Sequence, residues 1–351
     1  MQDHGEIPTL RQIARQAGVS AMTVSRALKN HPRQSVETNR RIRELARQMG
    51  WKPNPLVSAL MSQRVRQGGT RSSANLAILD PRAEDPAANA DYIRGARQQA
   101  AEHGYFLDEF PYRPAEVSPK KLRAILEARG IRGVILMPLP VGQDHVSFEF
   151  SGLAAATIGY SVQKPSLPRV ANDTQAAVFD ALHRLENLGY RRVGLVMARD
   201  ANRRTLYLTT GARAAYQTFL SQALRVRELI LPHEKFDQSQ KEKILSWIDR
   251  QAVDAVISSA GDFYEKVILP RFAPGELGYL HLHRHSRPEV SSMDQMRAYQ
   301  GRMAVDLVTA MIQRNESLPV KYPQITLTPS VWKEGRTTPA RIASRPGRQP
   351  A

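Results

Sequence analysis

The sequence predicts an α-helical N-terminal module that contains a helix-turn-helix, followed by an α/β domain of two lobes. In residues 9–26, apolar residues at helical spacing are interrupted by a glycine and a serine, which is typical of two short helices joined by a tight turn. From residue 74 onward, short apolar runs alternate with amphipathic helices, and this alternation indicates parallel sheets with helices on both faces. The excess of positive charge is also concentrated near the N-terminus.

The residues of the predicted helix-turn-helix suit each of its parts. The apolar face of the first helix is formed by Leu10, Ile13, Ala14 and Ala17. Gly18 gives the backbone freedom that a sharp turn needs, and Ser20 is a good N-cap for a second helix that begins at Ala21. That helix turns Val24 inward and leaves Ala21, Met22, Thr23, Ser25 and Arg26 outward. Such a helix start is typical of a helix that contacts bases in the DNA major groove, and an ordinary helical hairpin is the alternative.

A third helix and a further short helix are expected next. Ser35 is a suitable N-cap for the third helix, which ends near Gly50. Pro53 breaks that helix, and Pro55 suits the first position of a new helix that extends to about residue 64. The segment 67–73 is rich in Gly and Ser, which predicts a linker.

The charge distribution indicates a polyanionic partner. The formal net charge is +17, and residues 1–71 hold thirteen Lys and Arg against four Asp and Glu. DNA and an anionic membrane both satisfy the charge alone, and the helix-turn-helix favours DNA. The chain has no cysteine, which excludes disulfides and thiolate metal sites. We find no signal peptide and no apolar run long enough to span a membrane, so we expect a cytoplasmic protein.

The N-terminal motifs resemble those of one known family. The pattern A-G-V-S-x-x-T-V-S-R is present at residues 17–26, S-x-x-T at residues 35–38, and an aromatic-x-P-N sequence at residues 51–54. Residues 9–61 are thus similar to the DNA-binding headpiece of the LacI/GalR family of bacterial transcription regulators. The resemblance implies that the second helix contacts the major groove and that residues 55–64 form a hinge helix. It also implies that hinge helices pair in a homodimer and insert Leu60 into the minor groove, which kinks the DNA.

The resemblance also indicates which residues contact DNA. The candidate DNA-binding residues are Thr9, Ser20, Ala21, Met22, Thr23, Ser25, Arg26, Arg33, Thr38, Asn54 and Leu60. Ala21 and Met22 make no hydrogen bonds to bases but suit contact with thymine methyl groups. The alternatives are that Met22 fills a gap in the packing and that Leu60 packs in a dimer seam.

The large domain resembles the sensor domain of the same family, which is similar to periplasmic sugar-binding proteins. We expect strands near residues 75–79, 105–107, 133–137, 154–159, 192–197, 228–231, 255–258 and 278–282, in two sets that divide near residue 165. The resemblance implies a small-molecule effector, of the class of sugars and sugar derivatives, held at the carboxyl ends of these strands. The candidate effector-binding residues are Asp80, Tyr92, Asp173, Arg204, Asp262 and Asp294. Surface placement or helix capping is the alternative for each of them.

Two features depart from the family pattern in this effector region. Leu208 stands where the family often has an arginine, and Arg203 and Arg204 are close enough to substitute for it. Three histidines alternate at His281, His283 and His285, where the family often has a Gly-x-Asp-Asp-like segment. Alternate residues of a strand share a face, so the rings project together, either as hydrogen-bonded histidines or as a metal site. We favour hydrogen-bonded histidines and expect neither a metal nor a cofactor.

The sequence therefore predicts a transcription regulator rather than an enzyme. It contains no G-x-S-x-G motif, no P-loop and no G-x-G-x-x-G motif after a strand. We expect a repressor of carbohydrate-related genes that binds double-stranded operator DNA as a homodimer. The alternatives are a constitutive DNA-binding regulator with a vestigial sensor and a solute-binding protein that does not bind DNA. The expected domains are residues 1–67 with the helix-turn-helix and hinge helix, 68–335 for effector binding and dimerisation, and 336–351 as a disordered basic tail.

Overall fold

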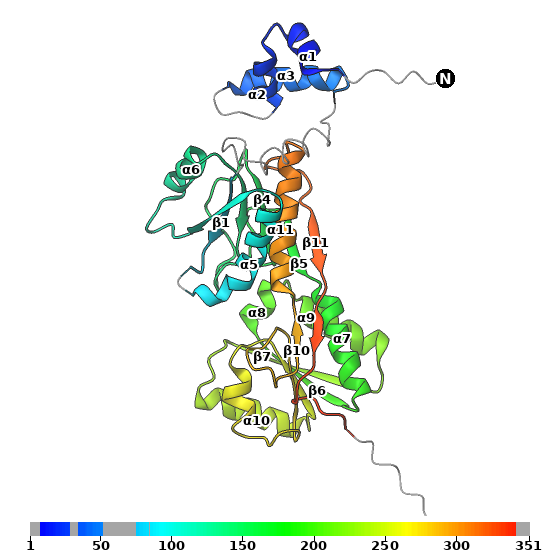
Figure 1. Ribbon diagram of the computed structural model, residues 1–351. Helices are drawn as coiled ribbons and strands as arrows, with labels where there is room; N and C mark the ends of the chain where they lie inside the picture. Colours follow the sequence, from blue (N-terminus) through cyan, green and yellow to red (C-terminus); the bar gives the residue numbers. More distant parts are fainter. Residues whose placement is uncertain (1–7, 29–33, 52–74, 84, 342–351) are drawn as a thin grey trace, which may run out of the picture.

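The computed structural model describes residues 8–28, 34–51, 75–83 and 85–341 (Figure 1). Three candidate DNA-binding residues, Arg33, Asn54 and Leu60, lie outside the described residues. The expected hinge helix at residues 55–64 and the linker at residues 67–73 lie outside them too. Three helices of the N-terminal module lie within the described residues.

The N-terminal module is a bundle of three short helices, as the sequence predicts. They are α1 (Leu10–Ala17), α2 (Ala21–Leu28) and α3 (Val36–Gln48). Their shared core consists of Ile13, Ala14, Val24, Ala27, Leu28, Ile42 and Ala46. Gly18 ends α1 with φ at 68°, a left-handed conformation that costs glycine little, and this geometry allows the sharp turn into α2. Ser20 accepts a hydrogen bond from the Thr23 amide at 3.1 Å, which confirms it as the cap of α2.

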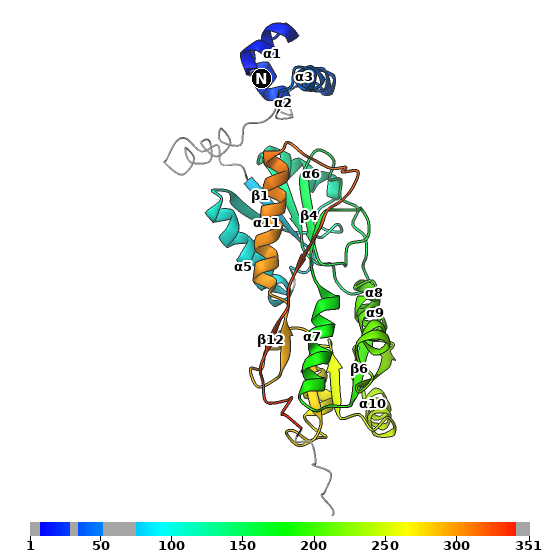
Figure 2. The same ribbon diagram turned by 90° about the vertical axis from the view of Figure 1, so that its right-hand side faces the viewer.

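Two six-stranded sheets form the two lobes of the remaining chain (Figures 1 and 2). In lobe one the strand order is β11-β5-β4-β3-β1-β2, and the neighbouring strands pair in parallel. Its strands are β1 (Asn75–Asp80), β2 (Phe106–Pro111), β3 (Ile131–Leu136), β4 (Ala154–Ile158), β5 (Arg169–Asn172) and β11 (Ile325–Thr328). Helices α5 (Pro86–Glu102) and α11 (Arg297–Gln313) cover one face, and α6 (Pro119–Ala128) covers the other.

Lobe two repeats this order as β12-β10-β9-β8-β6-β7, with β12 antiparallel to β10. Its strands are β6 (Arg192–Ala198), β7 (Arg225–Leu231), β8 (Ala255–Ser258), β9 (Gly278–His281), β10 (Ser292–Asp294) and β12 (Val331–Lys333). Its helices are α7 (Thr174–Asn187), α8 (Arg199–Arg204), α9 (Leu208–Ala215) and α10 (Gln238–Arg250), with π-helical turns η1 (Tyr216–Leu220) and η2 (Tyr264–Ile268). Helices α7 and α9 pack on one face of the sheet and α10 packs on the other.

The chain crosses between the lobes three times, which corrects the single division expected near residue 165. It passes from β5 into α7, returns from β10 into α11, and leaves again from β11 into β12. Helix α11 therefore follows a strand of lobe two but packs in lobe one. Its buried side chains belong to the hydrophobic core that also contains side chains of β3 and β4. The three crossings lie together, and this arrangement lets the lobes change their relative angle about a short hinge.

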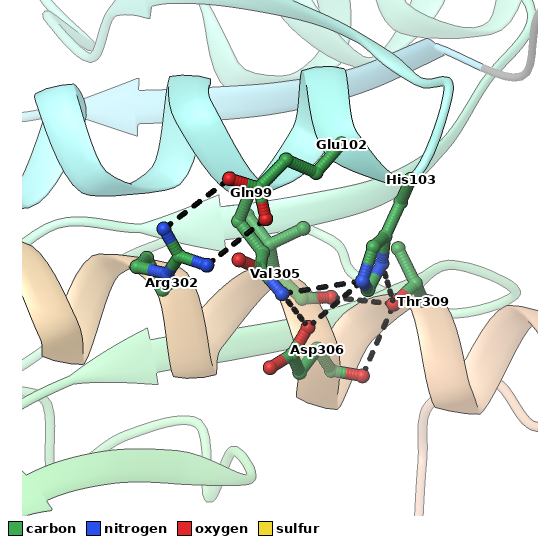
Figure 3. A network of polar contacts seen from close by, with 7 residues as sticks. All are labelled: Gln99, Glu102, His103, Arg302, Val305, Asp306 and Thr309. Atoms are coloured by element: carbon green, nitrogen blue, oxygen red, sulfur yellow. Dashed lines mark hydrogen bonds and ion pairs between the residues drawn. The ribbon is translucent and has the colours of Figure 1, made fainter.

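Polar contacts fasten α11 to α5 in lobe one (Figure 3). The Gln99 amide donates to Asp306 at 2.7 Å, and the His103 ring lies 3.3 Å from the same carboxylate. Arg302 pairs with Glu102 at 2.9 Å nearer the surface. Because residues about two hundred positions apart are joined here, α11 is held as part of lobe one even though it begins at the boundary between the lobes.

The predicted disordered tail is wrong over residues 336–341. This segment packs on lobe two, where Thr338 is 1% exposed and shares a hydrogen bond of 2.6 Å with Ser291. Tyr190 donates to the carbonyl of Pro339 at 2.9 Å. The polar composition misled the prediction, since backbone and hydroxyl hydrogen bonds, rather than apolar side chains, hold the segment in place. Residues 342–351 lie outside the described residues.

Candidate nucleic-acid interface and interlobe cavity

The start of α2 presents a mixed apolar and basic surface. Met22 is 62% exposed, and Arg26, one helical turn further on, is also exposed. Ala21 and Thr23 are half-buried beside them. Within the described headpiece residues Arg26 forms no ion pair, so its guanidinium is available to a phosphate or a base. A large apolar side chain beside a free cation on a helix start suits a duplex groove, where thymine methyl groups and acceptors are both present.

The other described candidates lie around this helix. Thr9 caps α1 by a capping box, in which Gln12 accepts from the Thr9 amide at 2.6 Å. Ser20 caps α2, and Thr38 lies in the first turn of α3, where its hydroxyl accepts from Ser35 at 2.7 Å. Ser25 belongs to α2, and its side chain is outside the description. The hydroxyls of Thr9 and Ser20 therefore also have a role in starting a helix.

Two arginines of α3 hold the bundle together. Arg41 donates to the carbonyl of Ala17 at 3.3 Å, and Arg43 donates to the carbonyl of Ala27 at 3.2 Å. These carbonyls belong to the last turns of α1 and α2. Carbonyls at the end of a helix have no hydrogen-bond partner within that helix. Partial burial lowers the pKa of Arg43. Part of the basic charge in this module is thus structural, and the exposed arginines supply the remaining positive surface.

A cavity of about 800 Å³ lies between the two lobes. Its walls come from the carboxyl ends of strands in both sheets, including the segments after β1 and β3 and those after β6 and β8. These strand pairs are the points where each doubly wound sheet reverses its winding direction, and ligands bind at such points in open α/β sheets. Helix α8 lies where the lobes meet (Figures 1 and 2). The cavity therefore has the position and size of a small-molecule site.

Of the six candidate effector-binding residues, the structure places Tyr92 and Arg204 on the cavity wall. Asp80 is buried and accepts from the Asn89 amide at 2.7 Å, so it orients a wall residue without lining the cavity itself. Asp294 accepts from the Met296 amide at 2.9 Å and fixes the start of α11. Asp80 and Asp294 thus act through neighbouring residues.

The remaining two candidates have local structural roles. Asp173 caps α7 by accepting from the Ala176 amide at 3.0 Å, and Asp262 pairs with Lys266 one helical turn away. Neither lines the cavity. Capping and surface pairing, the alternatives that the sequence left open, describe both residues in this structure.

Close packing of α5 against α11 brings Tyr92 and Arg297 together. A Cβ atom on Gly301 would lie 2.0 Å from the carbonyl oxygen of Tyr92, and one on Gly95 would meet the backbone of Ala298. Only glycine allows the helices to approach this closely. Arg297, the first residue of α11, consequently lies over the Tyr92 ring at 5.7 Å, a cation–π distance.

The three histidines gather on the same wall, though not by strand alternation. Strand β9 ends at His281, and the bend that follows brings the rings of His283 and His285 to 5.8 and 5.0 Å from it. Burial and the neighbouring His283 lower the pKa of His281 to about 2, and burial and Arg297 lower the pKa of His283 to about 3. Both rings are neutral near pH 7 and offer hydrogen bonds. Across the described ranges, no group of three or more His, Cys, Asp or Glu side chains is arranged to hold a metal ion.

Sequence reasoning missed several wall residues, most notably Arg82, Asn89 and Arg297. Arg82 and Asn89 flank the start of α5 just after β1, and Arg297 starts the helix just after β10. Arg82 and Asn89 follow the strand predicted at residues 75–79, and this position was the signal that could have found them. No strand was predicted at β10, so Arg297 had no such signal. The choice of acidic candidates instead reflected the expectation of a neutral, hydroxyl-bearing ligand.

Residues 9–54 match the model of the family described as "Bacterial regulatory proteins, lacI family". This N-terminal segment is therefore similar to the DNA-binding domain of that family. Among curated relatives, it is 28% identical over 189 residues to the HTH-type transcriptional repressor CytR of Escherichia coli (strain K12), covering 54% of this chain and 53% of the relative. The chain thus matches about half the length of such relatives, which are regulators rather than enzymes.

Solved structures of LacI-type regulators share the fold. The lac repressor dimer bound to operator and the anti-inducer ONPF superposes with a TM-score of 0.53 at 14% identity, covering 95% of this chain and 100% of that one. A periplasmic binding protein/LacI transcriptional regulator from Alkaliphilus metalliredigens, complexed with D-xylulofuranose, gives 0.56 at 13% identity, covering 76% and 99%. The architecture is therefore a LacI-type helix-turn-helix domain followed by a periplasmic-binding-protein-like α/β domain. Within the described residues, no helix is long and apolar enough to cross a membrane.

Proposed function

We propose that this protein is a sequence-specific DNA-binding transcription regulator, a repressor of carbohydrate-related genes, controlled by a small molecule in the interlobe cavity. The observation that carries the proposal is the exposed start of α2, with Met22 and with Arg26, which forms no ion pair among the described residues, inside a domain that matches the LacI-family model. The repressor CytR supports the sign of regulation, and the sugar in the Alkaliphilus complex supports the ligand class. We propose that it has no enzymatic activity and acts in the cytoplasm, where its DNA partner lies.

We propose that the DNA-bound form is a homodimer. Two copies related by a two-fold axis present two α2 helices to a palindromic operator, and Leu60 of each copy enters the minor groove between them. We also propose two functional domains. Residues 1–67 bind DNA, and residues 68 onward bind the ligand and form the dimer contact. The segment up to residue 341 joins the second part, because it packs on lobe two.

Selection from a pool of random duplexes tests this proposal. The full chain is expected to enrich a palindromic sequence, and binding to that sequence should weaken steeply with salt because arginines displace counterions from phosphates. A gel shift between 50 and 200 mM salt should show a loss of roughly tenfold or more in affinity. Enrichment of no sequence, or binding that does not depend on salt, would refute the proposal.

A further inference from the structure

The walls of the interlobe cavity carry more positive than negative charge. The basic residues that line it are Arg82, Arg204, Lys235, Arg284 and Arg297. The acidic residues that line it are Asp200 and Glu234. Burial and the neighbouring Asp262 raise the pKa of Glu234, which weakens its value as a counter-charge. Binding of a neutral sugar does not require this excess of positive charge.

Three of the arginines converge on Tyr92 from different parts of the fold. Arg297 lies over its ring from the start of α11, and Arg82 comes from the loop after β1 in lobe one. Arg204 comes from α8 in lobe two and reaches across to donate to the carbonyl of Leu139 at 2.8 Å. Burial raises the pKa of Tyr92, and the charges of Arg297, Arg204 and Arg82 each act to lower it, so all three lie near its phenol.

Few counter-charges lie beside these guanidinium groups among the described residues. Among the residues that the structure describes, Arg204 and Arg297 form no ion pair. Arg82 contacts the exposed Asp85 at 3.5 Å, a weak surface pair. Burial and the repulsion from Arg82 lower the pKa of Arg204, and the carboxylate of Glu234 only partly offsets this shift. Placing like charges together out of water is costly unless an anion joins them.

Unpaired neutral polar atoms lie beside the arginines. Asn89 is 1% exposed, yet its Oδ1 atom has no hydrogen-bond partner among the described residues. The hydroxyl of Ser259 is likewise buried without a hydrogen-bond partner there. The Nε2 atom of His285 is also buried without a hydrogen bond, although it lies 3.7 Å from the carboxylate of Glu265. All three residues line the cavity. Their atoms suit the hydroxyl groups of a ligand, since each would otherwise remain unsatisfied.

We propose that the interlobe cavity binds an anionic, hydroxyl-bearing small molecule, whose carboxylate or phosphate lies against Arg204 and Arg297 and whose hydroxyls meet Asn89 and His285. This inference rests on the proposed function, because it names the ligand class of the same effector site. Arginine forms paired hydrogen bonds with carboxylate and phosphate, so both sources share one recognition chemistry. An anion against Arg204 also offsets the repulsion between Arg204 of lobe two and Arg82 of lobe one, and so favours the arrangement of the lobes in which these two residues are close.

Calorimetry and thermal shift on the full chain test the ligand class. The probes are D-glucose, D-glucuronate, glucose 6-phosphate and inorganic phosphate. We expect at least one hydroxylated anion to bind and raise the melting temperature, with an affinity that falls as salt rises and exceeds that of glucose by tenfold or more. Comparison of glucuronate with glucose 6-phosphate distinguishes a carboxylate from a phosphate. Binding of glucose alone, or of none of the anions, overturns the inference.

Matched variants locate the anion in the cavity. Arg204→Gln and Arg297→Gln should each weaken anion binding at least tenfold and reduce its salt dependence. The controls are Arg203→Gln and Arg302→Gln, which remove the same charge from the same two helices at residues that do not line the cavity. These controls should bind the anion within about twofold of the unmodified chain. Equal losses in all four variants, or no loss in the cavity variants, overturn the assignment.

Failure of this inference is distinguishable from failure of the proposed function. DNA affinity that responds to glucose, with no anion bound, removes the inference and keeps the regulator. An anion that binds through Arg204 and Arg297 but leaves operator affinity unchanged supports the site chemistry and removes effector control.

Discussion

At the residue scale, Met22 distinguishes α2 from a recognition helix that contacts bases through hydrogen bonds. It is 62% exposed at the start of α2, where a groove contact would bury its side chain. Burying an apolar side chain on the major-groove surface gives contact with thymine methyl groups and no hydrogen bond. Base preference should therefore depend on Met22 and on the neighbouring Arg26 together.

We predict that Met22→Ala changes base preference. The variant should lose about 1 kcal/mol of affinity for the selected operator, roughly fivefold in Kd, with little change on random DNA. The matched control is Val36→Ala, because Val36 is 84% exposed and lies at the start of α3. Selection from random duplexes measures the preference, and an unchanged preference would show that Met22 makes no base contact.

The buried histidines give a second prediction at this scale. The pKa of His283 is lowered from 6.5 to about 3, so the unfolded chain binds a proton between these values while the native protein does not. Stability consequently falls as the pH falls through this window, by about 1.4 kcal/mol per pH unit for one such group. Urea unfolding at pH 7 and pH 5 should show a smaller loss for His283→Asn than for the unmodified chain. An equal loss in both proteins would contradict the neutral state of this ring.

At the scale of elements, the contact between α5 and α11 positions the cavity. Gly301 faces the carbonyl of Tyr92 so closely that a methyl group has no room. The same contact sets Arg297 over the Tyr92 ring. Helix packing and ligand chemistry therefore depend on the same pair of elements.

We predict that Gly301→Ala lowers the free energy of unfolding by about 1–3 kcal/mol, because the helices must separate. It should also weaken ligand binding, since Tyr92 and Arg297 move apart. The matched control is Gly211→Ala in α9, where nothing lies within 4 Å of the added methyl group. That change should raise the stability by about 0.5–1 kcal/mol. Urea unfolding measures both, and a Gly301→Ala variant of unchanged stability would refute the close packing.

Local patterns predicted the elements better than the connections between them. The caps at Ser20 and Ser35 and the turn at Gly18 were predictable because each depends on neighbouring residues. Short strands such as β10 (Ser292–Asp294) and β12 (Val331–Lys333) have no periodicity of their own and form through pairing with distant strands. The return of α11 to lobe one likewise depends on partners in α5 far away in the sequence.

The residues of the cavity were also only partly predictable from local patterns. Arg204 was predictable from its place beside the family pattern, and Tyr92 from its helix after a strand. Arg82 follows a predicted strand, whereas Arg297 is not distinguishable by sequence from the many other arginines of this basic chain. Their common position appears only when three crossings between the lobes bring the strand ends together.

At the scale of the whole molecule, we expect the angle between the lobes to couple the DNA-binding module to the interlobe cavity. A ligand that prefers one lobe arrangement shifts the population toward it, and DNA that prefers another opposes the shift. By linkage, any factor by which the ligand lowers DNA affinity is the factor by which DNA lowers ligand affinity. We predict equal factors from titrations in both directions. Unequal factors would mean that one titration reports a different event.

The most direct measurement is operator affinity with and without the bound anion, in the unmodified chain and in Arg204→Gln. We predict that glucuronate or glucose 6-phosphate changes the Kd for the selected operator by fivefold or more in the unmodified chain. In Arg204→Gln the Kd without ligand should stay the same, and the response should disappear. A response that persists in Arg204→Gln, or an operator affinity that no cavity ligand changes, would contradict it.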